Sequence, residues 1–238
     1  MSNITKHQVE GWPVWHITDA YQTDVIRRWT EWYMQAGIKW GWREDPINNV
    51  EKSRTETYEK AMLMTPEEQM QIFGPNPYLS EWNTDQNTEL SDLNRVRLHT
   101  NIITGGRYFY GHTDVTPEDP RNLLISLWFG TPCWDNPEGG MYLGKSEQML
   151  IPNQFNSMIL FPAQLWHKTQ GFEGTNIRVT VYASYEEHNP GEIKVWQDLP
   201  NVFDTDPLKQ RNISRKCLRK YGVQMPYHSD NDQGKKLI

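Results

Sequence analysis

The sequence His112-Thr113-Asp114 contains two side chains that commonly bind metal ions. The stretch around it reads as a strand, and side chains at positions i and i+2 of a strand point to the same face. His112 and Asp114 are therefore expected to lie side by side. Two ligands are too few to hold a metal, so a third must come from elsewhere in the chain. His99 and His167, on predicted strands or strand ends, are the two candidates.

Two histidines and one carboxylate can support more than one reaction. On one face of a metal they form the facial triad of non-haem iron(II) oxygenases, which leaves positions open for a cosubstrate and oxygen. A zinc hydrolase can use the same ligand types. The ligand set by itself therefore leaves the reaction open.

Arg178 adds a group that could bind an acid. The stretch from residue 176 to residue 185 alternates, which predicts a strand with an apolar face and a face carrying Arg178, Thr180, Tyr182 and Ser184. A buried guanidinium is costly without an anion, and its fork binds a carboxylate through two hydrogen bonds. Thr180 would add a hydroxyl donor on the same face. The alternative is an arginine paired with an Asp or Glu on a solvated sheet face.

Short strands separated by Gly, Pro and Asn are expected to position these groups. Such a series is typical of an antiparallel sandwich or barrel. The expected strands span residues 95–103, 107–114, 123–129, 141–143, 148–151, 157–161 and 177–185. Outside this series, the sequence predicts a strand at 12–18, a helix after Asp19, a helix beginning near Pro66 and ending near Gly74, and a helix over 207–221.

The expected fold class is mainly β with flanking helices (α+β). The 238 residues suit a single domain. Within it we expect a helix-rich N-terminal flank over 1–94, a β-core over 95–188 and a helical tail over 189–238. The N-terminal helices, the segment 82–92 and the loop 131–136 are expected to wall the mouth of the site, because loops on a rigid scaffold usually set specificity.

Charge and composition exclude several classes of protein. The net charge is −6, and the one basic stretch, from Lys209 to Lys220, reads as a solvated helix face, so a nucleic-acid partner is not expected. The two cysteines, Cys133 and Cys217, do not form a disulfide framework. No apolar run is long enough to span a bilayer, and the N-terminus lacks the apolar core of a signal peptide. A cytoplasmic location is therefore expected.

Four motifs together resemble the 2-oxoglutarate/Fe(II) oxygenase superfamily, in particular its prolyl-4-hydroxylase-like branch. The motifs are His112-Thr113-Asp114, Glu138-Gly139-Gly140, Leu160-Phe161-Pro162 followed by Trp166-His167, and Arg178-Val179-Thr180. The resemblance covers roughly residues 95–188. It implies a double-stranded β-helix (jelly-roll) core and Fe(II) held by His112, Asp114 and His167. It also implies that Arg178 and Thr180 hold the distal carboxylate of 2-oxoglutarate.

The chain departs from the family pattern just before His112. In similar prolyl hydroxylases a Gly-Gly turn and a tyrosine precede the His-x-Asp motif with one residue fewer than in this sequence. By strand period Tyr108 and Tyr110 share a face with His112, so either tyrosine could line the cosubstrate pocket. A bulge at Gly111 would break this parity.

The resemblance implies a hydroxylase that couples oxidative decarboxylation of 2-oxoglutarate to oxidation of a substrate by O2. Related halogenases replace the carboxylate ligand by a small residue, so Asp114 favours hydroxylation. Two substrate classes fit: a protein prolyl residue, which needs an open groove, and a small metabolite or amino acid, which needs a lidded pocket. The alternatives are a metal-dependent hydrolase and a non-catalytic jelly-roll binding module.

Overall fold

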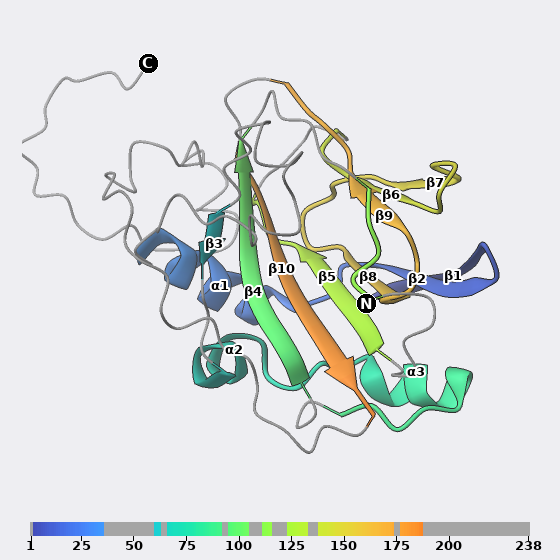
Figure 1. Cartoon of the computed structure of the whole chain (residues 1–238). Coiled ribbons are helices and arrows are strands. Elements are labelled where there is room, and N and C mark those ends of the chain that lie inside the picture. Colours follow the sequence, from blue (N-terminus) through green and yellow to red (C-terminus); the bar gives the residue numbers. More distant parts are fainter. Residues whose placement is uncertain are drawn as a thin grey trace, which may run out of the picture.

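Two antiparallel sheets form the centre of the chain (Figure 1). The computed structural model describes residues 2–35, 60–62, 66–91, 95–104, 111–115, 123–132, 138–173 and 177–187. Tyr108, Tyr110, both cysteines, the basic stretch and the expected C-terminal helix lie outside these residues. The larger sheet has seven strands in the order β1-β2-β8-β5-β10-β4-β3, and the smaller has three in the order β7-β6-β9.

The larger sheet is built from strands far apart in the sequence. Its members are β1 (Asn3–Val9), β2 (Trp12–Thr18), β3 (Lys60–Met62), β4 (Arg95–Thr104), β5 (Leu123–Phe129), β8 (Met158–Pro162) and β10 (Ile177–Glu186). The smaller sheet consists of β6 (Met141–Leu143), β7 (Met149–Ile151) and β9 (His167–Thr169). All strand pairings in both sheets are antiparallel.

One face of the larger sheet packs against helices. Helices α1 (Thr23–Gln35), α2 (Pro66–Phe73) and α3 (Leu79–Gln86) contribute Trp29, Phe73 and Trp82 to a buried cluster with Val179 and Val181 of β10. The side chains of β10 that carry odd numbers therefore belong to the helix side. The even-numbered side chains must point to the opposite face, toward the smaller sheet.

The opposite face of the larger sheet packs against a second buried cluster. This cluster contains Leu143 of β6, Ile151 of β7 and Tyr182 of β10. Strand β5 is buried along its whole length, because alternate residues enter the two clusters. Its uninterrupted apolar sequence is thus the pattern of a central strand covered on both faces.

Most expected elements are present. The mainly β architecture with flanking helices is confirmed, and the strands at 12–18, 123–129 and 141–143 have the predicted bounds. Helix α1 follows Asp19 as expected, and α2 begins at Pro66 and ends at Phe73, one residue before Gly74. Among the described residues, no helix is long and apolar enough to cross a membrane.

The sequence interpretation missed β1, β3, β9 and α3. Strand β1 has a mostly polar sequence and is held at the sheet edge by its antiparallel register with β2. The N-terminal segment therefore supplies strands as well as helices to the molecule. The expectation that segment 82–92 walls the site was wrong at Trp82, which is buried against Trp15 with ring centroids 5.1 Å apart.

Candidate functional site

A short backbone pairing brings His112 next to His167. The amide of His112 donates to the carbonyl of His167 over 2.9 Å, and the amide of His167 donates back to the carbonyl of His112 over 2.8 Å. Two residues further on, the amide of Asp114 donates to the carbonyl of Ala163 over 3.0 Å. Because these bonds hold residues 112–114 along the turn before β9, the two imidazoles lie with ring centroids 4.5 Å apart.

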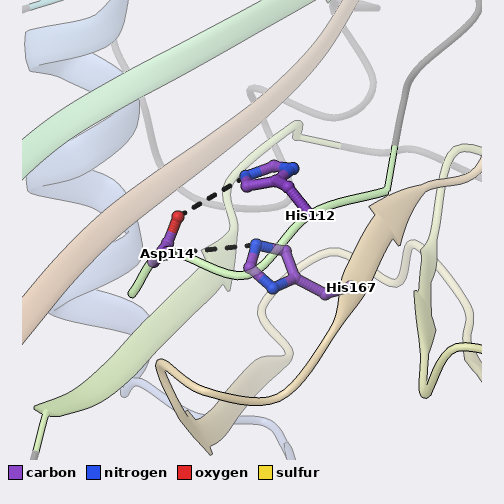
Figure 2. A group of neighbouring side chains, drawn as sticks. All are labelled: His112, Asp114 and His167. Carbon is purple, nitrogen blue, oxygen red and sulfur yellow. Dashed lines mark ion pairs between the residues drawn. The ribbon is translucent and has the colours of Figure 1, made fainter. Parts of the chain in front are cut away.

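The side chains of His112, Asp114 and His167 point toward one another (Figure 2). Nε2 of His112 lies 3.4 Å from Oδ1 of Asp114, and Nε2 of His167 lies 4.0 Å from Oδ2. Ligand atoms that share one metal at about 2.1 Å lie about 3 to 4 Å apart. The two nitrogens and the carboxylate therefore form a group that could hold a metal ion. His167 is the histidine that forms this group with His112 and Asp114.

The ring of His167 is oriented by a backbone contact. Its Nδ1 lies 3.0 Å from the carbonyl oxygen of Leu165. A carbonyl oxygen only accepts hydrogen bonds, so Nδ1 is the donor in this contact, and the ring is held with Nε2 directed toward Asp114. Metal-binding histidines usually show this arrangement. The ring is buried against Phe161, with centroids 5.1 Å apart, whereas the side chain of His112 is 42% exposed. The group therefore opens to solvent on the His112 side.

Asp114 is held by a group from the larger sheet. The hydroxyl of Tyr182 in β10 donates a hydrogen bond to Oδ2 of Asp114 over 2.8 Å. Burial by itself would raise the pKa of the Asp114 carboxyl. The hydrogen bond from His112, the charges of His167 and His112 and the bond from Tyr182 outweigh it and hold that pKa well below its usual range. The side chain is therefore an anion, the form that binds a cation.

Gly111 has a packing role next to this group. A Cβ atom at Gly111 would overlap the indole of Trp166. Only glycine therefore lets Trp166 lie against the backbone just before His112. This close packing supports the position of the backbone that carries His112.

Arg178 and Thr180 lie on the inner face of β10, as the alternation predicted. Their side chains are 1% and 0% exposed. The guanidinium carbon of Arg178 lies 5.4 Å from the centroid of the Phe129 ring. This burial contradicts the alternative of an arginine on a solvated sheet face.

The Glu138-Gly139-Gly140 motif packs against the same arginine. Gly139 has a φ of +77°, a conformation that favours glycine. A Cβ atom at Gly139 would lie 3.0 Å from the ring of Phe172, 3.4 Å from Cδ of Arg178 and 3.5 Å from Nδ2 of Asn153. The motif is thus a close-packed turn beneath the stem of Arg178.

Two residues of this region were missed by the sequence interpretation. Tyr182 was placed on the face of Arg178 and Thr180 but was given no role. Its position four residues after Arg178 on the same strand face was an available signal. Asn153 lies between β7 and β8, and no spacing in the sequence connects it to Arg178.

Comparisons with known proteins give structural neighbours only. No protein-family model matches the chain, and no curated protein matches it. The non-haem alpha-ketoglutarate-dependent epimerase SnoN of nogalamycin biosynthesis is 11% identical; the match covers 82% of this chain and 87% of that chain, with a TM-score of 0.53. A Pseudomonas putida prolyl-4-hydroxylase is 12% identical, with coverage of 74% and 93% and a TM-score of 0.46.

A third neighbour is a prolyl hydroxylase from Trichoplax adhaerens, solved with a peptide of the hypoxia-inducible factor. It is 17% identical, with coverage of 73% of this chain and 83% of that chain and a TM-score of 0.49. At these identities the likeness concerns the fold, and the match to the epimerase is the one of the three with a TM-score above 0.5. The fold of this chain is therefore similar to that of the alpha-ketoglutarate-dependent epimerase SnoN.

Proposed function

We propose that the chain is an Fe(II)- and 2-oxoglutarate-dependent dioxygenase that hydroxylates its substrate. The observation that carries this proposal is the convergence of His112, Asp114 and His167 (Figure 2). Two imidazole nitrogens and one carboxylate are the ligand set of the facial triad, and they suit ferrous iron. The contact of His167 Nδ1 with the carbonyl of Leu165 and the hydrogen bond from Tyr182 orient the atoms that would face the metal.

Iron bound here would use O2 to convert 2-oxoglutarate and a C–H bond of the substrate into succinate, carbon dioxide and a hydroxyl group. The protein must then hold the acid in one orientation beside the metal. Arg178 and Thr180 are the groups proposed to bind its distal carboxylate, through the guanidinium fork and the hydroxyl. Tyr108 or Tyr110 is proposed to line the same pocket.

Strand β10 connects the candidate metal ligands with Arg178, the residue proposed to bind the carboxylate. Tyr182 contacts Asp114, and Arg178 stands four residues earlier on the same face. At the usual rise of about 3.3 Å per residue their Cα atoms are roughly 13 Å apart. Phe129, under Arg178, and Phe161, beside His167, belong to one buried cluster. A five-carbon diacid and the side chain of Arg178 are together long enough to span this distance of roughly 13 Å along β10.

The jelly-roll topology is part of the proposal. In it, β8-β5-β10-β4 of the larger sheet face a smaller sheet of β7-β6-β9. The bridge from His112 to His167 adds the His112 segment to the outer edge of β9. Eight strand segments in two facing antiparallel sheets fit a jelly roll. The two metal-ligand segments then lie side by side at one edge of the smaller sheet.

An anaerobic titration of Fe(II) into the protein with 2-oxoglutarate tests the proposal, with the visible metal-to-ligand charge-transfer band as readout. We expect a band in the wild type, none in His167→Ala, and a far higher 2-oxoglutarate requirement in Arg178→Ala. His7→Ala in edge strand β1 and Arg27→Ala on the exposed side of α1 are the matched controls and should behave as wild type.

Absence of a band in folded wild-type protein with excess iron would rule out the oxygenase. A hydrolase that uses the same triad would turn over without oxygen. Comparison of aerobic and anaerobic activity therefore separates these two functions. Peptidyl proline, and small metabolites including free amino acids, are the two substrate classes to screen, with succinate formation as the measurement.

A further inference from the structure

The loop between β7 and β8 holds two buried asparagines with opposite surroundings. Asn156 is 6% exposed and fully engaged: its Oδ1 accepts from the amide of Tyr21 over 2.9 Å and from the indole of Trp128 over 3.3 Å. Its Nδ2 donates to the carbonyl of Tyr21 over 2.9 Å. This network ties the loop to the segment before α1. Asn156 is therefore a structural residue.

Asn153 is 2% exposed, yet neither its Nδ2 nor its Oδ1 has a hydrogen-bond partner in the described part of the chain. A buried amide without partners is costly, so each such group in a folded protein needs an explanation, such as bound water, an ion or a functional role. An aliphatic side chain of the same size would fill this position at lower cost. Both polar atoms of the Asn153 side chain are therefore available to bind a ligand.

The surroundings of Asn153 identify the kind of ligand. Its Nδ2 and the Cδ of Arg178 both lie within 3.5 Å of the point where a Cβ of Gly139 would stand. The side chains of Asn153 and Arg178 thus border the same small space above the Gly139 turn. Asn153 reaches this space from the loop before β8, and Arg178 reaches it from β10.

Thr180 provides a second buried donor on the same strand face as Arg178. Its Oγ1 also has no hydrogen-bond partner among the described residues. An amide N–H, a hydroxyl and a guanidinium near one another are all donors, and a carboxylate accepts hydrogen bonds through both of its oxygens. Such a set suits an acid with one negative charge at its far end.

We infer that Asn153 binds the distal carboxylate of 2-oxoglutarate, donating a hydrogen bond from Nδ2 beside Arg178 and Thr180. This inference rests on the proposed function. Because the amide is neutral, it adds a directed hydrogen bond while Arg178 alone balances the charge of the carboxylate. Asn153 would thereby favour an oxo acid with a second carboxylate over one with an apolar end.

The test uses Asn153→Leu and Asn153→Asp, with the thermal stability of the free protein and the affinity for 2-oxoglutarate in the anaerobic Fe(II) form as readouts. Asn153→Leu should keep or raise the melting temperature of the free protein, because it removes unpartnered polar atoms. Its 2-oxoglutarate affinity should fall about tenfold or more, as expected for the loss of a hydrogen bond to a charged group. Asn153→Asp should bind more weakly still, because it places a second anion beside the carboxylate.

Two variants of the same loop are the controls. Asn156→Leu should lower the melting temperature and leave the affinity for 2-oxoglutarate unchanged, because it breaks the Tyr21 and Trp128 hydrogen bonds. Gln154→Leu, at an exposed position, should change neither.

The two proposals can fail separately. If the wild type binds no 2-oxoglutarate in the presence of iron, the proposed function is wrong and this inference falls with it. If the wild type binds and Asn153→Leu binds equally well, only the role of Asn153 is overturned. A lowered melting temperature of free Asn153→Leu together with unchanged affinity would instead make Asn153 structural, like Asn156.

Discussion

The hydroxyl of Tyr182 donates a 2.8 Å hydrogen bond to Oδ2 of Asp114, and this bond joins the larger sheet to the candidate metal centre. Asp114 belongs to the short segment that pairs with His167, whereas Tyr182 lies in the middle of β10. A carboxylate oriented by a tyrosine keeps one geometry before a metal arrives. The bond also couples the centre to the strand that carries Arg178.

Tyr182→Phe tests this coupling. The change removes the hydroxyl and keeps the buried ring, so the fold should be retained. Loss of a group that orients a metal ligand typically lowers metal affinity about 10- to 100-fold, and we expect a decrease in this range in an anaerobic Fe(II) titration. Tyr142→Phe in β6 is the control and should keep wild-type affinity. Equal affinity of Tyr182→Phe and the wild type would mean that the hydrogen bond does not position Asp114.

Gly111→Ala tests the packing of Trp166 beside the centre. The added methyl group would overlap the indole, so either Trp166 or the backbone before His112 must shift. Overpacking of this kind costs about 1 to 3 kcal/mol, and we expect that loss in urea unfolding together with weaker Fe(II) binding. The double variant Gly111→Ala/Trp166→Leu should recover part of both. No recovery would show that the indole is not the obstacle.

Arg178→Lys separates the charge of the side chain from its geometry. Lysine keeps the positive charge but lacks the fork that forms two parallel hydrogen bonds with a carboxylate. We expect 2-oxoglutarate affinity to fall about tenfold or more, with Fe(II) affinity measured without 2-oxoglutarate unchanged. If Fe(II) affinity fell equally, Arg178 would be a structural support of the metal centre and not a binding group for the acid.

Because the pKa of His16 is lowered, we expect the folding stability of the protein to depend on pH in a way that does not involve the metal centre. Burial, with a smaller contribution from His7, lowers the pKa of His16 from its ordinary value of 6.5, and its Nε2 has no hydrogen-bond partner among the described residues. The unfolded chain therefore takes up a proton at a higher pH than the folded chain does. The contribution of His16 to stability is fully present above pH 6.5 and declines as the pH falls through 6.5 toward the lower pKa of the folded protein.

Urea unfolding at several pH values checks this expectation. His16→Gln should lose less stability than the wild type between neutral pH and mildly acidic pH, because glutamine does not titrate. His7→Gln is the control and should retain most of the wild-type pH dependence, because burial is the larger cause of the shift. Parallel curves for His16→Gln and the wild type would contradict the prediction.

Local sequence patterns determined the parts of the site that depend on a single strand. The alternation from residue 176 to residue 185 placed Arg178 and Thr180 on one face, and both are buried there. The apolar run over 123–129 is the central strand β5, with both faces covered. These features follow from the two-residue period of a strand, which needs no knowledge of the partner strands.

The tertiary structure decided which distant residues meet. Residue type and predicted position left both His99 and His167 open, and the resemblance to the oxygenase superfamily implied His167. The backbone pairing of His167 with His112 is what brings it to the candidate metal centre. Asn153 and Arg178 come together at the Gly139 turn, which packs against both side chains. Helix α3 likewise joins the core through a contact between distant residues, the packing of Trp82 against Trp15. Contacts between segments far apart in the chain depend on the order and register of the strands in the sheets. Strand order and register are set by the packing of the whole core, and the local periodicity of the sequence does not reveal them.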